Sequence, residues 1–574
     1  MLRLAIGVLA CAVLATVALG HPSSSLEVLF TPANDPNPGA RAAALGLRQA
    51  LFTSQSLKDA GLTNVPDYAI NVTVPAGFLG SNDLTAEENN LLDSIYSTLI
   101  PEGATQAAAI LLNTTLNTLD DFENLYTIWG ITPVGLENWR TDAHFGRLRK
   151  TFYPRFLKLT TVLPAFVPAG TVSTFDLAAQ RIYDVDYAAE LTGVDPKSTK
   201  FGTPYALFKQ ANPRLASSPL LPIGIYLQGV WYTPADGAAW LLAKIACNGL
   251  EANLNFAEHG LESHMIMSAV AVATERQLYG NTVGDPAVPV HPVHAIIAQS
   301  LKTNIPLNGF GFPAVFNIGT TYDLSSALGS AAVHRLVNRD WASLTWEQRY
   351  FDFGIASRGL TNLAGFDYAT DLYAYEYAIR ARVNSFLAKY YSHDSEVAAD
   401  TEIQAWAADI GTNGHVYGFP SPIATQQTLE DVLTHILMHV PRHHADASAI
   451  YPNAQLVLPY APWKFYDTCS FPATAADKAG VTEAFIVQKC MPKLVDAVGT
   501  LAHAIGFMRP FGPEYTLLDS GNTAPTGNRD QHSRDGYTSD LTAISEDIQS
   551  RPTAGVTLPY VLLDPAQLSN TCFN

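Results

Sequence analysis

Hydrophobic side chains recur along this chain mainly at the spacing of helices. Apolar residues three or four positions apart predict helices over 85–119, 238–282, 293–302, 368–391 and 426–439. The candidate strands, at 222–232 and 556–563, are short and isolated. Residues 22–140 do not alternate as a β-sandwich would, so no separate β-domain is expected there. The pattern therefore predicts an all-α fold, mainly helical, with minor β-ribbons.

The N-terminus has the pattern of a signal peptide. Met1–Gly20 carries one early cation, Arg3, followed by an uncharged apolar run. That run is shorter than the roughly 20 residues that cross a bilayer, and small residues at its end fit cleavage before His21. We therefore expect a secreted, extracellular protein, with a retained membrane anchor as the alternative.

The remaining sequence, residues 21–574, shows no feature that divides it into domains. It has no fixed-period repeat, and its Pro and Gly residues are spread rather than pooled in a linker. We expect one domain and a monomer, without stable membrane insertion, because no later stretch is long and apolar enough to span a bilayer. The formal net charge of −18 disfavours nucleic acid as a partner, since binding it needs clustered Lys and Arg.

The cysteines fit an oxidising compartment. Cys11 would leave with the signal peptide, so four cysteines remain, and these permit three pairings. Cys469 and Cys490 are the expected pair because the loop between them is short, whereas Cys247 lies in an apolar helical stretch as a candidate core thiol. Cys572 has no assigned partner. No CxxC motif occurs, which argues against a zinc site built on cysteines.

Two glycosylation sequons agree with secretion. They are Asn71-Val-Thr73 and Asn113-Thr-Thr115, and we expect Asn71 and Asn113 to be the acceptors. Such a sequon has meaning only in a protein that enters the secretory pathway.

Two histidines in the long central helical stretch are candidate metal ligands. His259 and His264 are five positions apart, so on a regular α-helix their side chains point about 140° apart. A π-bulge, with i→i+5 hydrogen bonds, brings positions five apart onto one face, and such bulges concentrate at functional sites. The spacing predicts that both rings converge on one point from an under-wound helix.

A second histidine cluster lies further along the chain. His435, His439 and His443 are spaced four apart and would form one stripe on a continuous helix. Pro441 removes a backbone donor and should distort the helix just before His443. For His435 and His439, a place in the core without metal is an equal alternative.

Together these segments resemble the lipoxygenase family over about 139–574. The resemblance is carried by Trp240-Leu-Leu-Ala-Lys244, then His259-x4-His264, Ala273-Thr-Glu-Arg-Gln-Leu278, His291-Pro292, Leu558-Pro-Tyr-Val-Leu-Leu563 and the ending Ser569–Asn574. It is closest to the secreted fungal, manganese-type branch, which lacks the N-terminal β-barrel domain. The resemblance implies a lipoxygenase-like catalytic domain over residues 21–574.

The resemblance also implies a set of metal ligands. His259 and His264 would be the first two, and the terminal carboxylate of Asn574 would be the last. The family usually ends in Ile or Val, but the difference matters little because the ligand is the main-chain carboxylate and not the side chain. The third ligand would be His443 or His444. His444 is preferred in this interpretation because it places Ser448, which can ligate, where the family usually has Asn.

Choosing His443 would place Ala447, which cannot ligate, at that position. Asp446 is close enough in sequence to intervene, and Ser448 is a weaker ligand than Asn.

The implied activity is a non-haem metal dioxygenase that inserts O2 into polyunsaturated fatty acids of the linoleate or linolenate type and gives hydroperoxides. One Mn or Fe ion per chain is implied, with Mn favoured, and nitrogen and oxygen ligands suit either metal. The only catalytic group would be the metal's own hydroxide. An apolar channel is then needed, and the aromatic segment 310–316 is a candidate wall, with core packing as the alternative.

Three other functions are alternatives, and the sequence supports them unequally. A lipoxygenase-like protein that has lost catalysis and binds lipid is the main alternative, motivated by Ser448. A zinc hydrolase would need His-Glu-x-x-His, and Glu262 has the wrong spacing for that motif. A helical haem peroxidase would need a proximal-histidine context, which we do not find.

Overall fold

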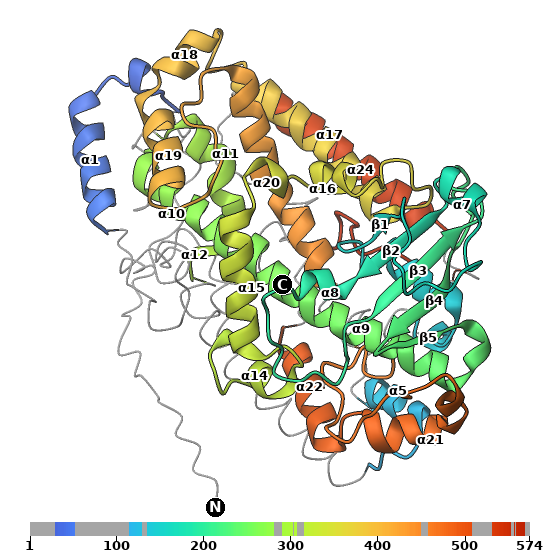
Figure 1. Cartoon of the computed structure of the whole chain (residues 1–574). Coiled ribbons are helices and arrows are strands. Elements are labelled where there is room, and N and C mark those ends of the chain that lie inside the picture. The colour runs from blue at the N-terminus through green and yellow to red at the C-terminus, as the bar shows by residue number, and fades with distance from the viewer. Residues whose placement is uncertain are drawn as a thin grey trace, which may run out of the picture.

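The structure is a computed structural model, and helices dominate the part of the chain that it describes (Figure 1). The described residues are 29–51, 114–128, 135–280, 290–301, 304–306, 315–448, 457–507, 531–552, 556 and 558–568. The signal peptide, both sequon asparagines, Cys572 and Asn574 lie outside them, so those expectations stay predictions. Most of the predicted helix 85–119 lies outside as well. The mainly helical fold class is confirmed.

The centre of the fold is one long helical stretch. α9 (Ala238–His259) continues into the π-helix η6 (Gly260–Ile266) and then into α10 (Met267–Gln277), which confirms the predicted helix 238–282 up to Gln277. Nearly every side chain of α9 is buried, and burial all round its surface is typical of a helix in the core of a large protein.

Other long helices surround this stretch and confirm three further predicted helices. α20 (Gln426–Ser448) packs against α9, η6 and α11 (Pro292–Leu301), and it also contacts α17 (Asp367–Leu387). Figure 1 shows α17 and α24 running side by side, and the two helices are in contact. The remaining long helices are α15 (Gly329–Ser343), α19 (Thr401–Thr412), α22 (Leu494–Phe507) and α24 (Gln531–Ser550).

Short helices complete the helical body. They are η1 (Pro32–Asn34), α5 (Leu119–Ile128), η4 (Leu136–Asn138), α6 (Asp142–Leu148), α7 (Thr174–Ala178), α8 (Tyr187–Glu190), η5 (Pro234–Asp236), α12 (Asn304–Pro306), α14 (Thr321–Ser325), η8 (Glu347–Arg349), α16 (Phe351–Ser357), α18 (Asp394–Ala399), η9 (Ala476–Gly480), α21 (Glu483–Phe485) and η10 (Ile486–Cys490). No helix in the described residues is both long and apolar enough to span a bilayer.

The N-terminal region is tied to the helical body. α1 (Pro38–Leu51) packs on α10, and its buried Arg41 and Arg48 pair with Glu402 and Glu275. Within the described part of residues 22–140, the only β-type pairing is one bridge between Leu29 and Val290. This agrees with the expectation that no β-domain is present there.

The single sheet of the described residues lies at one side of the helices (Figure 1). Its five antiparallel strands follow chain order, with register shifting between Leu207 and Phe208. The strands are β1 (Lys158–Leu159), β2 (Ile182–Asp186), β3 (Tyr205–Gln210), β4 (Leu220–Leu227) and β5 (Val230–Tyr232). The predicted strand 222–232 is thus the hairpin β4–β5. Its turn has positive φ at both Gln228 and Gly229, as a two-residue type I′ hairpin turn requires.

The prediction of a strand at 556–563 is wrong. The described residues of this stretch are irregular, and Leu558 and Leu563 are buried without a strand partner. Pro559 offers no backbone donor for a ladder. The apolar run therefore indicated burial rather than a strand.

The disulfide expectation is confirmed for one pair. Cys469 and Cys490 are bonded, 21 residues apart in sequence, and Cys247 is a free thiol buried in α9. The bond joins the loop after α20 to the end of η10, beside the helical core.

Candidate metal centre

His259 and His264 converge from one helix because its winding changes between them. His259 is the last residue of α9, and His264 lies within the π-helix η6. Their Nε2 atoms are 3.1 Å apart, and their rings stand nearly perpendicular at an interplanar angle of 82°. The prediction of a π-bulge that brings both rings to one point is confirmed.

The surroundings of the π-helix support this wide turn. Asn304 of α12 donates from Nδ2 to the carbonyl oxygen of Ser263 at 2.9 Å, which provides a donor inside the irregular segment. Gly260, at its first position, lies against the ring of Phe316, and a Cβ there would be 3.2 Å from two ring carbons. A side chain at 260 would therefore require Phe316 to move.

A third imidazole reaches the same point from α20. Ligand atoms of His259, His264 and His443 all lie within 4.8 Å of one another, and this is the one such group of histidine, cysteine or carboxylate atoms in the described residues. The ring centroid of His443 is 4.7 Å from that of His259 and 5.1 Å from that of His264. Packing of α20 against α9 and η6 brings the three rings together.

The structure favours His443 over the His444 that the sequence interpretation preferred. α20 continues through Pro441 to Ser448, and neighbouring residues on a helix point about 100° apart. His444 is buried and its ring lies 5.1 Å from that of His443, but it is not a member of the cluster. The proposed third ligand therefore moves to His443, the stated alternative. The side chain of Ser448 lies outside the described residues.

The other two histidines of the stripe have neighbours of their own. The ring of His435 packs against Trp346 and Tyr350, with centroids 4.5 Å and 4.1 Å away. Nε2 of His439 lies 3.3 Å from Nδ2 of Asn304. Neither belongs to the cluster of ligand atoms, so for both of them the structure favours a place in the core.

Burial keeps the three clustered imidazoles neutral. It lowers the pKa of His264 to about 4, and it lowers the pKa values of His259 and His443 well below the ordinary range, where neighbouring cations and imidazoles act in the same direction. Neutral imidazole is the form that binds metals. Two nitrogens that each lie about 2.1 Å from one ion at a right angle are about 3 Å apart. The observed 3.1 Å fits a shared ion.

An arginine links the two helices that carry these histidines. Arg155 lies between Glu258, which precedes His259, and Asp446, three residues after His443, with N–O distances of 3.5 Å and 3.1 Å. Burial acts to lower the pKa of Arg155, but the two carboxylates outweigh it and raise that pKa. Asp446, which the sequence placed close enough to intervene, is therefore engaged by an arginine.

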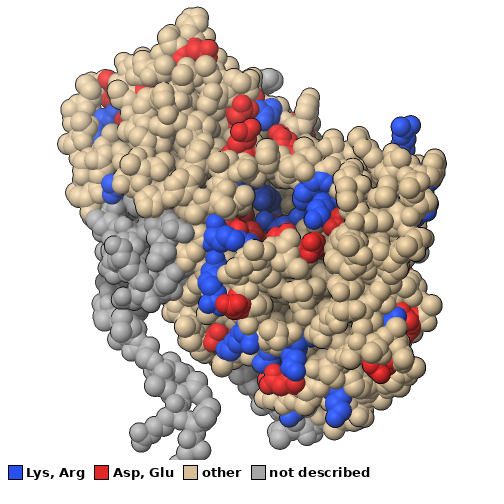
Figure 2. All heavy atoms as spheres, viewed as in Figure 1, with Lys and Arg blue, Asp and Glu red and all other residues tan. Residues whose placement is uncertain are grey.

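A second ion pair lies on the same helix surface. Arg349 pairs with Glu262 of the π-helix, and it also donates to the carbonyl oxygen of Asp340 at 3.0 Å. Arg442 donates to the carbonyl oxygen of Arg349 at 2.5 Å, which ties α20 to the same group. On the face shown in Figure 2, acidic and basic side chains likewise gather next to one another around a central hollow. Sequence reasoning missed Arg155 and Arg349 because isolated arginines carry no motif.

The C-terminal segment enters the core as far as it is described. Leu558, Leu563 and Leu568 are buried, and the hydroxyl of Tyr375 donates to the carbonyl oxygen of Leu563 at 2.6 Å. Asp564 accepts from Ser545 of α24 at 2.6 Å. The proposed ligand Asn574 follows six residues after Leu568 and stays a prediction.

Comparison with known proteins gives the same family in sequence and in fold. The lipoxygenase family model matches residues 356–453, a stretch that includes α17 and α20 with His443. A manganese lipoxygenase of Pyricularia oryzae is 28% identical over 489 residues, covering 78% of this chain and 75% of that protein. A polyunsaturated fatty acid lipoxygenase of Homo sapiens is 25% identical over 468 residues, covering 76% of this chain and 66% of its own length.

A solved structure of a manganese lipoxygenase superposes with a TM-score of 0.78 at 25% sequence identity. The superposition covers 95% of this chain and 99% of that one, so the similarity extends over the whole fold. The sequence and fold similarities point to the same kind of protein as the site does, in which two histidines on a π-helix meet a third histidine on α20. The chain is similar to the lipoxygenase family in sequence and has the lipoxygenase fold.

Proposed function

We propose that this chain is a secreted metal dioxygenase that inserts O2 into polyunsaturated fatty acids and forms hydroperoxides. The observation that carries the proposal is the convergence of His259, His264 and His443 within 4.8 Å, deep in a lipoxygenase fold. Three neutral imidazoles suit Fe, and the addition of a carboxylate oxygen makes the set suitable for Mn as well. Similarity to manganese lipoxygenases favours Mn.

In this proposal the protein holds one ion by those three histidines and by the terminal carboxylate of Asn574. Ser448 lies one helical turn after His444, and five residues after His443, so it is no longer the natural fourth ligand on α20 once His443 is chosen. The bound ion would supply one-electron redox chemistry that removes a hydrogen atom from a doubly allylic carbon. Everything else required of the site falls to the protein's own residues.

The protein's part is to hold the ligands and to exclude water. The burial of His259 and His443 and the partial burial of His264 keep the three imidazoles unprotonated, which is the form that binds a metal. Arg155 acts as a positioning residue because it joins the ends of the two ligand-bearing helices. Phe316 and Phe256, with ring centroids 5.2 Å apart, provide apolar packing beside the π-helix.

Secretion, glycosylation at Asn71 and Asn113, and a monomeric state complete the proposal. The apolar N-terminal run, the sequons and a disulfide between Cys469 and Cys490 all fit an oxidising, extracellular compartment. Recovery of the protein from culture medium with a mature N-terminus at His21 would test this part by N-terminal sequencing.

The test of function measures metal and product on the same sample. The purified chain should contain about one Mn or Fe per molecule and convert linoleate and O2 to a hydroperoxide with a conjugated diene, followed by ultraviolet absorbance. Metal without diene from either linoleate or linolenate would favour the catalytically impaired lipid-binding protein. Absence of both metal and diene, in protein that is folded by circular dichroism, would refute the proposal.

A further inference from the structure

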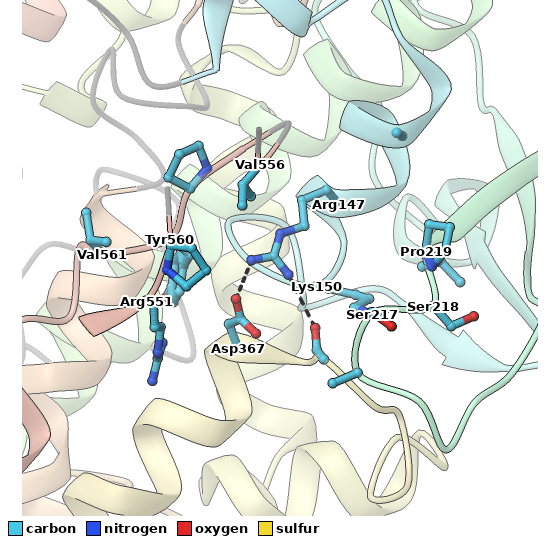
Figure 3. A pocket seen from close by; sticks show the side chains of 16 residues that line it. Arg147, Lys150, Ser217, Ser218, Pro219, Asp367, Arg551, Val556, Tyr560 and Val561 are labelled. Carbon is cyan, nitrogen blue, oxygen red and sulfur yellow. Dashed lines mark hydrogen bonds and ion pairs between the residues drawn. The ribbon is translucent and has the colours of Figure 1, made fainter. Parts of the chain in front are cut away.

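A cavity separate from the histidine cluster lies between α6, the start of β4 and the C-terminal segment. Its volume is about 400 Å³, and none of the clustered histidines lines it. In Figure 3, Arg551, Tyr560 and Val561 lie on one side and Ser217, Ser218 and Pro219 on the other. A volume of this order is sufficient for a small organic ligand.

Two of the three cations that line the cavity are already neutralised. Arg147 pairs with Asp367, as the dashed line in Figure 3 shows. Arg551 holds the buried carboxylate of Asp371 with both terminal nitrogens, at 3.0 Å and 2.5 Å. Each of these arginines therefore has its countercharge within the protein.

The third cation, Lys150, has no such partner. Its side chain is nearly inaccessible, with the residue 3% exposed, and no carboxylate among the described residues lies within ion-pair distance of Nζ. Nζ donates one of its three hydrogens to the carbonyl oxygen of Ala364 at 2.7 Å. A buried ammonium without a paired carboxylate is unfavourable. Burial, reinforced by Arg147 and only partly offset by the more distant Asp367, lowers the pKa of Lys150 to about 8.

The rest of the lining is largely apolar. Val556, Pro559, Tyr560 and Val561 of the C-terminal segment, together with Leu220, contribute hydrocarbon surface to the cavity. One uncompensated positive charge beside such a surface matches a molecule with one negative charge and a short apolar chain. A doubly charged anion such as phosphate would bring one charge too many.

We propose that this cavity binds a small monocarboxylate, with its carboxylate on Lys150 Nζ and its apolar chain against Val556, Pro559 and Tyr560. Pairing with Lys150 would supply the missing countercharge, and the two remaining hydrogens of Nζ would be the donors. The site is distinct from the metal centre, so an occupant is neither the substrate in its reacting position nor a metal ligand.

The test uses octanoate as the probe. 1-Octanol has the apolar chain without the charge, and inorganic phosphate has charge without an apolar chain. Binding to the purified, metal-loaded full chain is measured by isothermal titration calorimetry. We expect octanoate to bind and the other two to bind at least about tenfold more weakly, because each lacks one half of the recognised chemistry.

Two variants assign the binding to this cavity. Lys150→Met removes the charge at nearly constant length and should weaken octanoate binding about tenfold or more. Ser217→Trp places a bulky side chain at an exposed position of the rim and should also reduce binding, without touching the buried lysine. Lys209→Met is the matched control. Lys209 of β3 pairs with Asp176 of α7 and does not line the cavity, so this variant should bind octanoate as the unmodified chain does.

Three outcomes would overturn the proposal. One is no detectable binding of octanoate to the unmodified chain. Another is unchanged affinity in both Lys150→Met and Ser217→Trp, which would move the octanoate to another site, including the proposed substrate site. The last is equal binding of phosphate or 1-octanol, since a monocarboxylate with an apolar chain would then not be the recognised class.

Discussion

The Nε2 atoms of His259 and His264 lie 3.1 Å apart although the two residues are five positions apart on one helical stretch. An α-helix would separate their directions by about 140°, whereas the wider π-helix from Gly260 to Ile266 brings them together. The change of winding thus places two candidate ligands from one helical stretch side by side. His443 of α20 supplies the third.

The neighbouring histidines of α20 should respond differently to substitution. His443→Ala removes a ring nitrogen from the cluster and should reduce bound metal at least about tenfold, because a three-imidazole site loses a ligand. His444→Ala should keep most of the metal, since that ring is not in the cluster. Metal content by plasma mass spectrometry, on protein of verified fold, makes the comparison.

The reverse ranking of the two variants would return the third ligand to His444 and Ser448. Equal metal retention in both would exclude this part of α20 from the site.

Much of this centre could be predicted from the sequence because it depends on local spacing. The interval between His259 and His264 is incompatible with a regular helix, so a π-bulge follows once both are taken as ligands. The choice between His443 and His444 depends on the phase of α20 after Pro441, which packing against α9 determines. The spacing to Ser448 favoured His444, whereas the helix turns His443 toward the other two histidines.

Features that depend on distant segments could not be predicted. Arg155 is 103 residues from Glu258 and 291 from Asp446, and no pattern in the chain announces that they meet. The apolar run at 556–563, predicted as a strand, is irregular and has Leu558 and Leu563 buried, because hydrophobicity indicates burial and says little about strand pairing.

Removing the link between the two ligand-bearing helices should loosen the centre. Arg155→Met leaves the carboxylates of Glu258 and Asp446 without their shared cation and should cost about 3 kcal/mol of unfolding free energy. The variant should also lose its metal to a chelator faster. The decay of activity over time measures this loss. Denaturant unfolding and chelator kinetics measure the two effects.

Arg155→Lys restores the charge but not the two-sided geometry, so it should recover part of the metal retention. Arg335→Met, on the exposed surface of α15, is the control and should change neither quantity. If Arg155→Met loses stability but releases metal at the unmodified rate, Arg155 is structural and does not position the ligands.

The disulfide should stabilise the fold without taking part in the chemistry. Replacing Cys469 and Cys490 together by Ala opens a 21-residue loop and should lower the free energy of unfolding by about 3 kcal/mol, mainly by enlarging the unfolded ensemble. Metal content at a temperature where the variant is folded should be unchanged. A large loss of metal from the folded double variant would show instead that this loop helps to hold the metal centre.

The chain end should tolerate a new side chain but not an extension. The segment is buried at Leu558, Leu563 and Leu568, and the six residues that follow can extend at most about 20 Å from there. A C-terminal tag or deletion of Asn574 should therefore abolish metal binding, while Asn574→Ile should preserve it. The control is the same tag inserted after His21, and a fully metallated C-terminally tagged protein would exclude the carboxylate as a ligand.

Anomalous X-ray diffraction from crystals of the metal-loaded protein locates the ion itself and so decides whether these three histidines hold it. We predict one strong peak per chain, at coordination distance from Nε2 of His259, Nε2 of His264 and a ring nitrogen of His443, with His444 outside that distance. A peak bound by His444 instead, or a metal located away from the histidine pair on the π-helix, would show that the three-histidine cluster is not the metal centre.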